Sequence, residues 1–455
     1  MLSVSGARGL IGKSMTPEVA ANIASAFGTE VRSGSESPPT ILIGNDGRSS
    51  GPELVEAAAK GLASTGCSVI DLGIVTTPTV GVMTSELGAQ GAIVVTASHN
   101  PIEWNGIKCL DANGLAPPPE EASRIIDRFK RLDFEFVPDE ERTTPGTDTT
   151  STRVHVERVL SIVDRDLIRS AGFTVVLDSV NASGGPGGRM LLEALGCTVE
   201  HLNGEQTGVF AHPPEPTAEN LVDLAGHIGR NGGCACGFAQ DPDADRLAII
   251  DENGRYIGEE FTLALAALRT LRKHGGVPLA ANLSTSRMID DIASGFEGAS
   301  VLRTAVGEAN VVAGMRATNA PLGGEGNGGV IVAEVGWVRD SIAAMALVLE
   351  LIAGEGRPLS RIVDDLPRYA MVKRKLDLSR IGGRDAIQPA LDRLREHYGD
   401  ARINDADGVR IDLDEGWVHL RASNTEPIIR LISESETTDA AEALADQAAT
   451  ASGIG

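Results

Sequence analysis

Short runs of hydrophobic residues alternate along the chain with longer segments in which hydrophobic residues recur every three to four positions. Thr40–Gly73 reads as a strand, a glycine-rich loop, a helix and a second strand, and Phe173–Gly204 and Pro278–Gly307 follow the same order. This alternation is typical of βαβ-type domains. The first two segments also share a Gly-Cys-x-Val ending, at Gly66–Val69 and Gly196–Val199. Duplication of one domain explains this similarity, and so does the general likeness of βαβ units.

Polar and turn-forming stretches divide this pattern into four predicted domains. Thr143–Arg153 reads as a linker, and a helix over Val154–Ile168 follows it. Further breaks lie at Asp251–Gly254 and at Leu366–Arg368. After the last break, two strand patterns, 409–413 and 417–423, precede a helix pattern at 439–451. We predict an α/β protein with three similar mixed-sheet domains and a smaller C-terminal α+β domain around a central cleft. The predicted boundaries are 1–150, 151–253, 254–367 and 368–455.

The composition limits the partners of the chain. Aromatic residues make up 3% of the sequence, so the cores must consist mainly of Val, Ile, Leu and Ala. The 40 basic and 63 acidic residues give a net charge of −23, which repels nucleic acid and anionic lipid. We therefore expect no nucleic-acid partner and no membrane partner, and any phosphate site must be locally basic.

The cysteines and the longest hydrophobic stretch point to a cytoplasmic protein. The five cysteines contain no C-x-x-C pair, which argues against a disulfide scaffold or a zinc finger, and four of them lie in hydrophobic surroundings typical of a core. No signal peptide is evident at the start of the sequence. The stretch Ser341–Ala353 contains Glu350 and is too short to cross a bilayer.

A hydrophobic strand pattern at Ile93–Val95 runs directly into the polar sequence Thr96–Pro101, Thr-Ala-Ser-His-Asn-Pro. One interpretation is a plain turn. The other is that Ser98 is a nucleophile presented at the carboxyl end of a strand.

Three aspartates alternate in the loop between two further strand patterns. Asp241, Asp243 and Asp245 would repel one another without a cation, and oxygen ligands suit Mg²⁺. An EF-hand needs glycine at the position of Arg246 and helices on both sides of the loop, so the pattern disfavours calcium of that kind. A solvated acidic turn is the remaining alternative to a catalytic magnesium loop.

Two later loops have the composition of ligand-binding loops. Leu322–Ile331 places Glu325 and Asn327 among glycines, as expected either for a loop that binds hydroxyl groups or for a β-turn. In Arg421–Leu431, two arginines bracket Ser, Asn and Thr, a set of groups that suits a phosphate dianion. The alternative is a surface loop with incidental arginines, which the net charge of −23 disfavours.

These four motifs, in this order, resemble those of the α-D-phosphohexomutase family, which includes phosphoglucomutase, phosphomannomutase and phosphoglucosamine mutase. The matching stretches are Thr96–Pro101, Asp241–Arg246, Gly324–Gly328 and Arg421–Arg430. Ser5–Glu18 and His212–Leu221 also resemble family segments, so the likeness covers nearly the whole chain.

The resemblance implies an isomerase that moves a phosphoryl group between C1 and C6 of a hexose phosphate. Ser98 would carry the phosphoryl group, donate it to a sugar monophosphate, and regain the other phosphoryl group of the resulting bisphosphate. One Mg²⁺ per chain would be held by Asp241, Asp243, Asp245 and the phosphorylated Ser98. Lys108 would be the general acid and base, with Arg8, His99 and Arg246 beside the phosphoserine. We do not expect His99 to act as a triad base, since adjacent side chains on an extended chain point apart.

The resemblance also implies the groups that bind the substrate. Glu325 and Asn327 would hold the sugar hydroxyls. The phosphate that does not react would be held by a set of residues in the C-terminal domain: Arg421, Ser423, Asn424, Thr425 and Arg430. The C-terminal domain would rotate to close the cleft. Arg48 resembles a family arginine and is either functional or part of a structural ion pair.

One departure from the family pattern concerns the third loop, where many members have serine and histidine. This chain has Asn327 and Gly329, and this version resembles a branch usually assigned to phosphoglucosamine mutases or to broad phosphohexose mutases. Glucose and mannose phosphates are the alternatives. A sugar-phosphate phosphatase, a sugar-bisphosphate synthase and a catalytically silent sugar-phosphate binding protein remain alternatives from other classes. We expect a monomer or homodimer that uses a sugar bisphosphate as activator.

Overall fold

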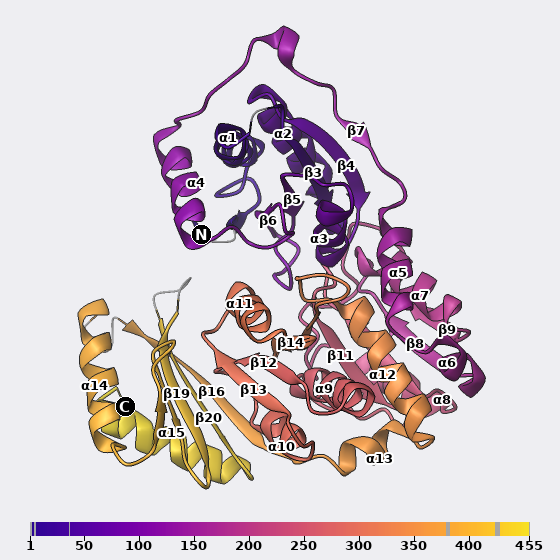
Figure 1. Ribbon diagram of the computed structural model, residues 1–455, viewed down its shortest axis with the longest axis vertical. Coiled ribbons are helices and arrows are strands. Elements are labelled where there is room, and N and C mark those ends of the chain that lie inside the picture. Colours follow the sequence, from indigo (N-terminus) through magenta and orange to yellow (C-terminus); the bar gives the residue numbers. More distant parts are fainter. Residues whose placement is uncertain (1, 4–5, 36, 379–382, 424–427, 455) are drawn as a thin grey trace. The chain divides into compact units, whose positions relative to one another are not determined.

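The computed structural model describes residues 2–3, 6–35, 37–378, 383–423 and 428–454, which form two compact units (Figure 1). The first unit contains residues 1–270 and 327–363, and the second contains residues 271–326 and 364–455. The N-terminal and second predicted domains therefore lie in the first unit, and the C-terminal domain lies in the second.

The N-terminal domain is built on one seven-stranded mixed sheet. Its strand order is β1-β2-β6-β5-β3-β4-β7. The strands, in this order, are Leu2–Ser3, Gly6–Leu10, Trp104–Asp111, Gly91–Val95, Thr40–Asn45, Ser68–Ile74 and Gly146–Thr147. The two-residue strand β7 pairs with β4 inside the stretch for which the sequence predicts a linker.

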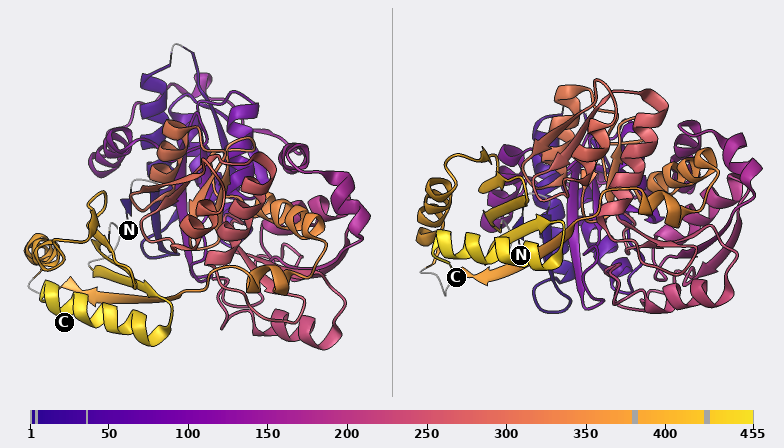
Figure 2. Two further views of the ribbon diagram at one scale, coloured as in Figure 1. Left: turned by 60° about the horizontal axis from the view of Figure 1, so that its bottom comes forward. Right: turned by 90° about the horizontal axis from the view of Figure 1, so that it is seen from below.

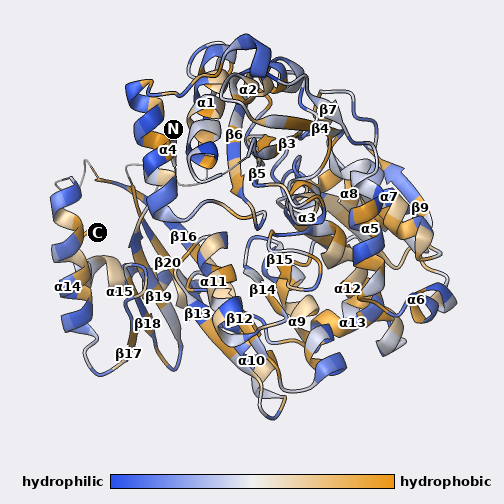
Figure 3. Cartoon of the chain, turned by 45° about the horizontal axis from the view of Figure 1, so that its top comes forward, coloured by the Kyte–Doolittle hydropathy of each residue, from blue (hydrophilic) through white to orange (hydrophobic). Residues whose placement is uncertain are grey.

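Helices cover both faces of this sheet, which explains why β3 and β5 are almost continuously hydrophobic. In β3, Ile41 and Ile43 pack in the cluster that contains α1 (Pro17–Ser33) and α2 (Gly51–Ser64). Leu42 points to the opposite face and packs in the cluster that contains α3 (Thr77–Glu86). The helix α4 (Pro119–Arg131) packs against α1, and Figure 3 shows its alternation of hydrophobic and hydrophilic residues.

The second domain has a four-stranded sheet in the order β11-β10-β8-β9. Its strands, in chain order from β8 to β11, are Thr174–Asp178, Thr198–Leu202, Cys236–Gln240 and Leu247–Asp251. The helix predicted over 154–168 is two helices, α5 (Ser151–Ser161) and α6 (Arg165–Ala171). The break has a local cause, since the Asp164 side chain caps α6 by accepting a hydrogen bond from the Leu167 amide. The helices α7 (Gly184–Ala194) and α8 (Val222–Asn231) complete the domain.

The topology of these two sheets positions the candidate chemistry. In the N-terminal domain, β3 lies between β4 and β5 and is parallel to both, and in the second domain β8 lies between β9 and β10 in the same way. Loops that leave the carboxyl ends of parallel strands at such a switch point form a ligand-binding crevice. The loop that contains Ser98 leaves β5, and the loop that contains Asp241 leaves β10.

The second unit repeats this arrangement. Strand β12 (Pro278–Asn282) lies between β13 (Ser300–Thr304) and β14 (Leu322–Glu325) and is parallel to both. The connecting helices are α10 (Met288–Ser294) and α11 (Glu308–Thr318). Three domains with one topology confirm the predicted set of similar α/β domains, and Glu325 takes the place in β14 that corresponds to the ends of β5 and β10.

The C-terminal domain consists of an antiparallel sheet and two helices, which confirms the predicted α+β domain and adds three strands and α14 to the two strands and one helix predicted. The strand order is β16-β20-β19-β18-β17. The strands, in chain order, are Ala370–Asp377, Arg402–Asn404, Val409–Asp412, Gly416–Ala422 and Ile428–Ser435. The helix α15 (Thr438–Ser452) runs along the sheet and packs on β16, β19 and β20 (Figure 2), and α14 (Ile387–His397) packs against α15.

The remaining described α-helices and strands are α9 (Glu260–His274), β15 (Gly329–Val332), α12 (Ser341–Glu355) and α13 (Leu359–Asp364). Within the described part of the chain, no helix is both long and hydrophobic enough to cross a membrane. All five cysteines are buried free thiols, which confirms the core positions predicted for four of them.

Candidate active site

The loop after β5 presents Ser98 in an unusual backbone conformation. Ser98 is buried and has φ = 51°, in the left-handed region that residues with a Cβ atom seldom adopt. Its hydroxyl donates to Asp241 Oδ2 at 3.2 Å, and Ser98 Oγ also lies 3.3 Å from His99 Nδ1. The premise that Ser98 and His99 point apart on an extended chain is therefore wrong, since the left-handed turn brings the two side chains together.

His99 is half-buried and lies in a positively charged environment. Burial, together with the nearby Arg246 and Arg8, lowers the pKa of His99 to about 3. The imidazole is therefore neutral near pH 7, and its nitrogen beside Ser98 has no fixed positive charge. A negatively charged group on Ser98 would instead be stabilised by the surrounding guanidinium groups.

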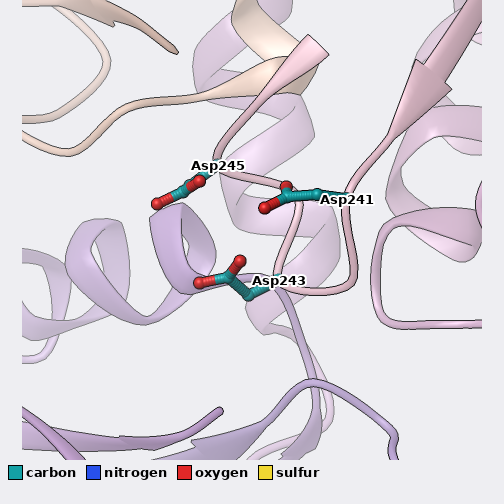
Figure 4. A group of neighbouring side chains, drawn as sticks. All are labelled: Asp241, Asp243 and Asp245. Atoms are coloured by element: carbon teal, nitrogen blue, oxygen red, sulfur yellow. The ribbon is translucent and has the colours of Figure 1, made fainter. Parts of the chain in front are cut away.

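The loop between β10 and β11 gathers the three aspartates predicted to hold a metal (Figure 4). Asp241, Asp243 and Asp245 are buried, and each offers a carboxylate oxygen such that these atoms all lie within 4.8 Å of one another. Ala244 takes φ = 53°, which turns the chain between the second and third aspartates.

The electrostatics of these carboxylates indicate a site for a cation. Burial and the mutual repulsion of the aspartates raise the pKa of Asp241 well above its usual value and also raise that of Asp243. Burial acts on Asp245 in the same direction, but Arg339, Lys108 and Arg246 lower the pKa of Asp245 to about 2. Two buried oxygens, Oδ1 of Asp243 and Oδ1 of Asp245, accept no hydrogen bond from the described residues. Such oxygens fit a hard divalent cation, which prefers carboxylate ligands.

Arg8 and Lys108 reach this region because of the register of the sheet. Arg8 in β2 lies opposite Gly106 in β6, so Arg8 and Lys108 are diagonal neighbours on one face. Arg8 Nη1 donates to Asn100 Oδ1 at 3.4 Å, and the charges of Arg8 and Lys108 interact with the metal-loop carboxylates. The structure thus brings both predicted residues close to the aspartates, and Arg8 also contacts the loop that contains Ser98.

Two charged residues at this site do not appear among the sequence predictions. Arg339 forms a short ion pair with Asp245, and Glu215 lies 4.0 Å from Arg246 Nη1 and 3.9 Å from His99 Nε2. Arg246 itself lies 3.8 Å from Asp245. Glu215 could have been predicted, because it belongs to the segment His212–Leu221, which resembles a family segment. Arg339 could not, because nothing in the sequence around it indicates a site residue.

The second unit contains the predicted sugar and phosphate groups. Glu325 Oε1 accepts hydrogen bonds from Asn282 Nδ2 at 2.8 Å and from the Gly307 amide at 3.2 Å. Arg421 Nε donates to Asp407 Oδ2 at 2.8 Å, and the same oxygen accepts the Val306 amide. Asp407 therefore ties Arg421 to the loop that precedes α11.

The two predicted phosphate-binding arginines are brought together by strand pairing. Arg421 in β19 and Arg430 in β20 are directly opposite one another. Two guanidinium groups on neighbouring strands suit the charge and geometry of a phosphate dianion, which agrees with the phosphate site that the sequence predicts. Ser423 follows β19 directly, and its amide donates a hydrogen bond to the carbonyl oxygen of Ile428 at the start of β20. Asn424 and Thr425 lie outside the described residues, and Asn327 lies in the first unit, where its Oδ1 accepts the Gly329 amide.

Acid should weaken the second unit through His419. This fully buried ring contacts Ser284 Oγ at 3.0 Å and the Asp407 carbonyl oxygen at 2.7 Å, and burial lowers the pKa of His419 to about 4. Because the folded state disfavours the proton, the stabilisation by neutral His419 is complete above the unfolded pKa of 6.5 and is lost as the pH falls towards 4.

We expect His419→Gln to lose less free energy of unfolding between pH 7.5 and pH 5 than the wild type, measured by urea titration. The exposed His274→Gln is the matched control, and an equal loss in His419→Gln would contradict this account.

Comparison with known proteins agrees with the fold and the motifs. Models of the phosphoglucomutase/phosphomannomutase family match alpha/beta/alpha domain I at residues 2–136, domain II at 153–254, domain III at 259–369 and the C-terminal domain at 376–451. A phosphoglucomutase/phosphomannomutase of Thermococcus kodakarensis is 39% identical over 437 residues, which cover 96% of this chain and 94% of that protein. A probable phosphoglucosamine mutase of Methanopyrus kandleri is 36% identical over 449 residues, 97% of this chain and 95% of that protein.

A solved structure extends the agreement to three dimensions. A phosphoglucomutase/phosphomannomutase family protein from Burkholderia thailandensis matches with a TM-score of 0.86 and 29% identity, and the match covers 100% of this chain and 99% of that one. The chain therefore belongs to the α-D-phosphohexomutase family, whose members are isomerases that move a phosphate within a hexose phosphate. The predicted family and enzyme class are confirmed.

Proposed function

We propose that the protein interconverts the 1- and 6-phosphates of a hexose through a phosphoserine at Ser98. The observation that supports this most directly is the contact between Ser98 Oγ and Asp241, because it joins the predicted nucleophile to the buried three-aspartate loop. Phosphoryl transfer depends on positioning and on neutralisation of charge, and the arginines and Lys108 around this contact supply positive charge.

The proposed reaction consists of two transfers that mirror each other. In the first, Lys108 takes the proton of a sugar hydroxyl, the sugar oxygen bonds to phosphorus, and the Ser98 Oγ–phosphorus bond breaks. In the second, Ser98 Oγ bonds to the other phosphorus of the sugar bisphosphate, and the sugar oxygen that leaves regains a proton from Lys108. Ser98 again carries phosphate, and the net result is a change of position on the sugar.

The other predicted residues have supporting roles in this proposal. Asp241, Asp243 and Asp245 would hold one Mg²⁺, which neutralises phosphate charge when bound. Arg8, His99 and Arg246 contact the phosphoryl group on Ser98. In the second unit, Glu325 binds sugar hydroxyls, and the non-reacting phosphate is held by the C-terminal loop with Arg421, Ser423, Asn424, Thr425 and Arg430. Asn327 is a further ligand for the sugar.

The preferred sugar in this proposal is glucosamine phosphate. The support is the third loop, in which Asn327 and Gly329 leave no imidazole, together with relatives described as probable phosphoglucosamine mutases at up to 36% identity. Glucose and mannose phosphates are the second candidate, because the relative with 39% identity is a phosphoglucomutase/phosphomannomutase.

The test is incubation of the protein with Mg²⁺, trace sugar bisphosphate and, in turn, the 1-phosphates of glucosamine, glucose and mannose, followed by ³¹P NMR. We expect 6-phosphates to form, with the highest kcat/KM for glucosamine phosphate. Faster conversion of glucose or mannose phosphate would replace the proposed sugar but keep the mutase. Release of inorganic phosphate without isomerisation would instead indicate a phosphatase.

A further inference from the structure

Arg48 is completely buried and binds backbone carbonyl groups of the loop after β5, which contains Ser98 and is called the nucleophile loop below. It lies in the loop after β3, next to the loop after β5, because these two strands are parallel neighbours. Its Nη2 donates to the Ser98 carbonyl oxygen at 2.6 Å. Its Nη1 lies within hydrogen-bond distance of three more carbonyl oxygens, those of Trp104 at 2.6 Å, Pro101 at 3.1 Å and Asn100 at 3.2 Å.

Asp46 connects the same guanidinium group to the other side of Ser98. Arg48 Nε donates to Asp46 Oδ2 at 2.8 Å, and that oxygen also accepts the Thr96 hydroxyl at 2.6 Å. Thr96 Oγ1 in turn accepts the Ser98 amide at 2.8 Å. The amide and the carbonyl group of Ser98 are thus both held by one buried ion pair.

This arrangement explains how Ser98 keeps its left-handed conformation, which is unfavourable for a residue with a Cβ atom. The same conformation directs Oγ to Asp241. The Phe210 ring lies 4.9 Å from the Arg48 guanidinium carbon and covers the ion pair. A lysine cannot replace this arginine, because one ammonium group lacks the planar fork that reaches carbonyl groups on both sides.

We propose that Arg48, paired with Asp46, is a positioning residue that fixes the Ser98 backbone for phosphoryl transfer without touching the substrate. This inference rests on the proposed role of Ser98 as the phosphoryl carrier. The sequence leaves Arg48 either functional or part of a structural ion pair; the structure contains the ion pair, and this proposal gives it a function.

The experiment compares Arg48→Lys with Arg269→Lys. Arg269 is also buried and paired with an acid, Glu350, and donates to the carbonyl oxygen of Ile162, remote in sequence from the nucleophile loop. For Arg48→Lys we expect kcat to fall by about 100-fold, with KM for the sugar phosphate within about threefold of the wild type. Phosphorylation of Ser98 by sugar bisphosphate, followed by intact mass, should slow by a similar factor. Arg269→Lys should lower the melting temperature and leave kcat and the phosphorylation rate unchanged.

Retention of the wild-type kcat and phosphorylation rate in Arg48→Lys would overturn the inference, as would an equal fall of kcat in Arg269→Lys. If Arg48→Lys does not fold, Asp46→Asn tests the same link, and wild-type kcat in that variant would also overturn it. Failure of the proposed function is distinguishable, because the wild-type protein itself would then take up no phosphate on Ser98.

Discussion

Replacement of Ser98 by alanine should abolish isomerisation, with a loss of kcat/KM of about 10⁴-fold or more. The loss is large because Ser98 Oγ would form and break the bond to phosphorus in both transfers, and no neighbouring group replaces it. The contact with Asp241 would be lost as well, but the metal loop itself stays intact. Conversion of the 1-phosphate to the 6-phosphate is measured by ³¹P NMR, and phosphate on the chain is measured by intact mass.

The control for this substitution is Ser25→Ala, which also removes a buried hydroxyl from the N-terminal domain. Ser25 Oγ donates to the Gly61 carbonyl oxygen between α1 and α2, at a distance of 3.3 Å. Its loss should lower the melting temperature and leave kcat unchanged. Isomerisation by Ser98→Ala within tenfold of the wild-type rate would exclude Ser98 as the phosphoryl carrier.

The elements with strong hydrophobic patterns were predictable from the sequence, and those created by tertiary contacts were not. The strand–helix–strand order of Thr40–Gly73 holds in β3, α2 and β4. The pattern is strongest in β3, because a strand buried on both faces must be hydrophobic almost throughout. The two-residue strand β7 has no such pattern and exists only through its pairing with β4. The break between α5 and α6 depends on the Asp164 cap. The hydrophobic residues continue at nearly helical spacing across this break, so the sequence pattern does not reveal it.

The site was predictable in its loops but not in its geometry. Ser98, Asp241 and Glu325 stand directly after or at the end of strand patterns, and parallel topology places such residues at the same edge of their sheets. The sequence does not reveal that Ser98 adopts a left-handed conformation, because that conformation is held by Asp46 and Arg48, about fifty residues earlier. Arg339 was missed for a similar reason, since only the folded chain brings it to Asp245.

Removal of the metal should have the second largest effect on activity, and it should also change stability. We expect chelation with EDTA to lower kcat at least about 10³-fold and added Mg²⁺ to restore it, because several kcal/mol of charge stabilisation depend on the ion. Without metal, the raised pKa of Asp241 favours the protonated carboxyl in the folded state. Its stabilising contribution is complete below the unfolded pKa and is lost as the pH rises through the folded pKa. At neutral pH, Asp241 therefore lowers the free energy of unfolding of the metal-free protein.

Asp241→Asn separates these two effects. This variant should melt at a higher temperature than the wild type when both are metal-free at pH 7.5, and it should lose both isomerisation and the increase in melting temperature that Mg²⁺ gives the wild type. Melting is followed by scanning fluorimetry with and without Mg²⁺, and the exposed Asp166→Asn, which should behave as the wild type, is the control. A metal-free Asp241→Asn protein that melts below the wild type would mean that Asp241 stabilises the fold without a cation. An unchanged response to Mg²⁺ would mean that the ion binds elsewhere. Two results are therefore required in the same variant: higher stability without metal, and loss of activity. Together they would show that the three buried carboxylates repel one another and that a bound cation offsets the free-energy cost of this repulsion.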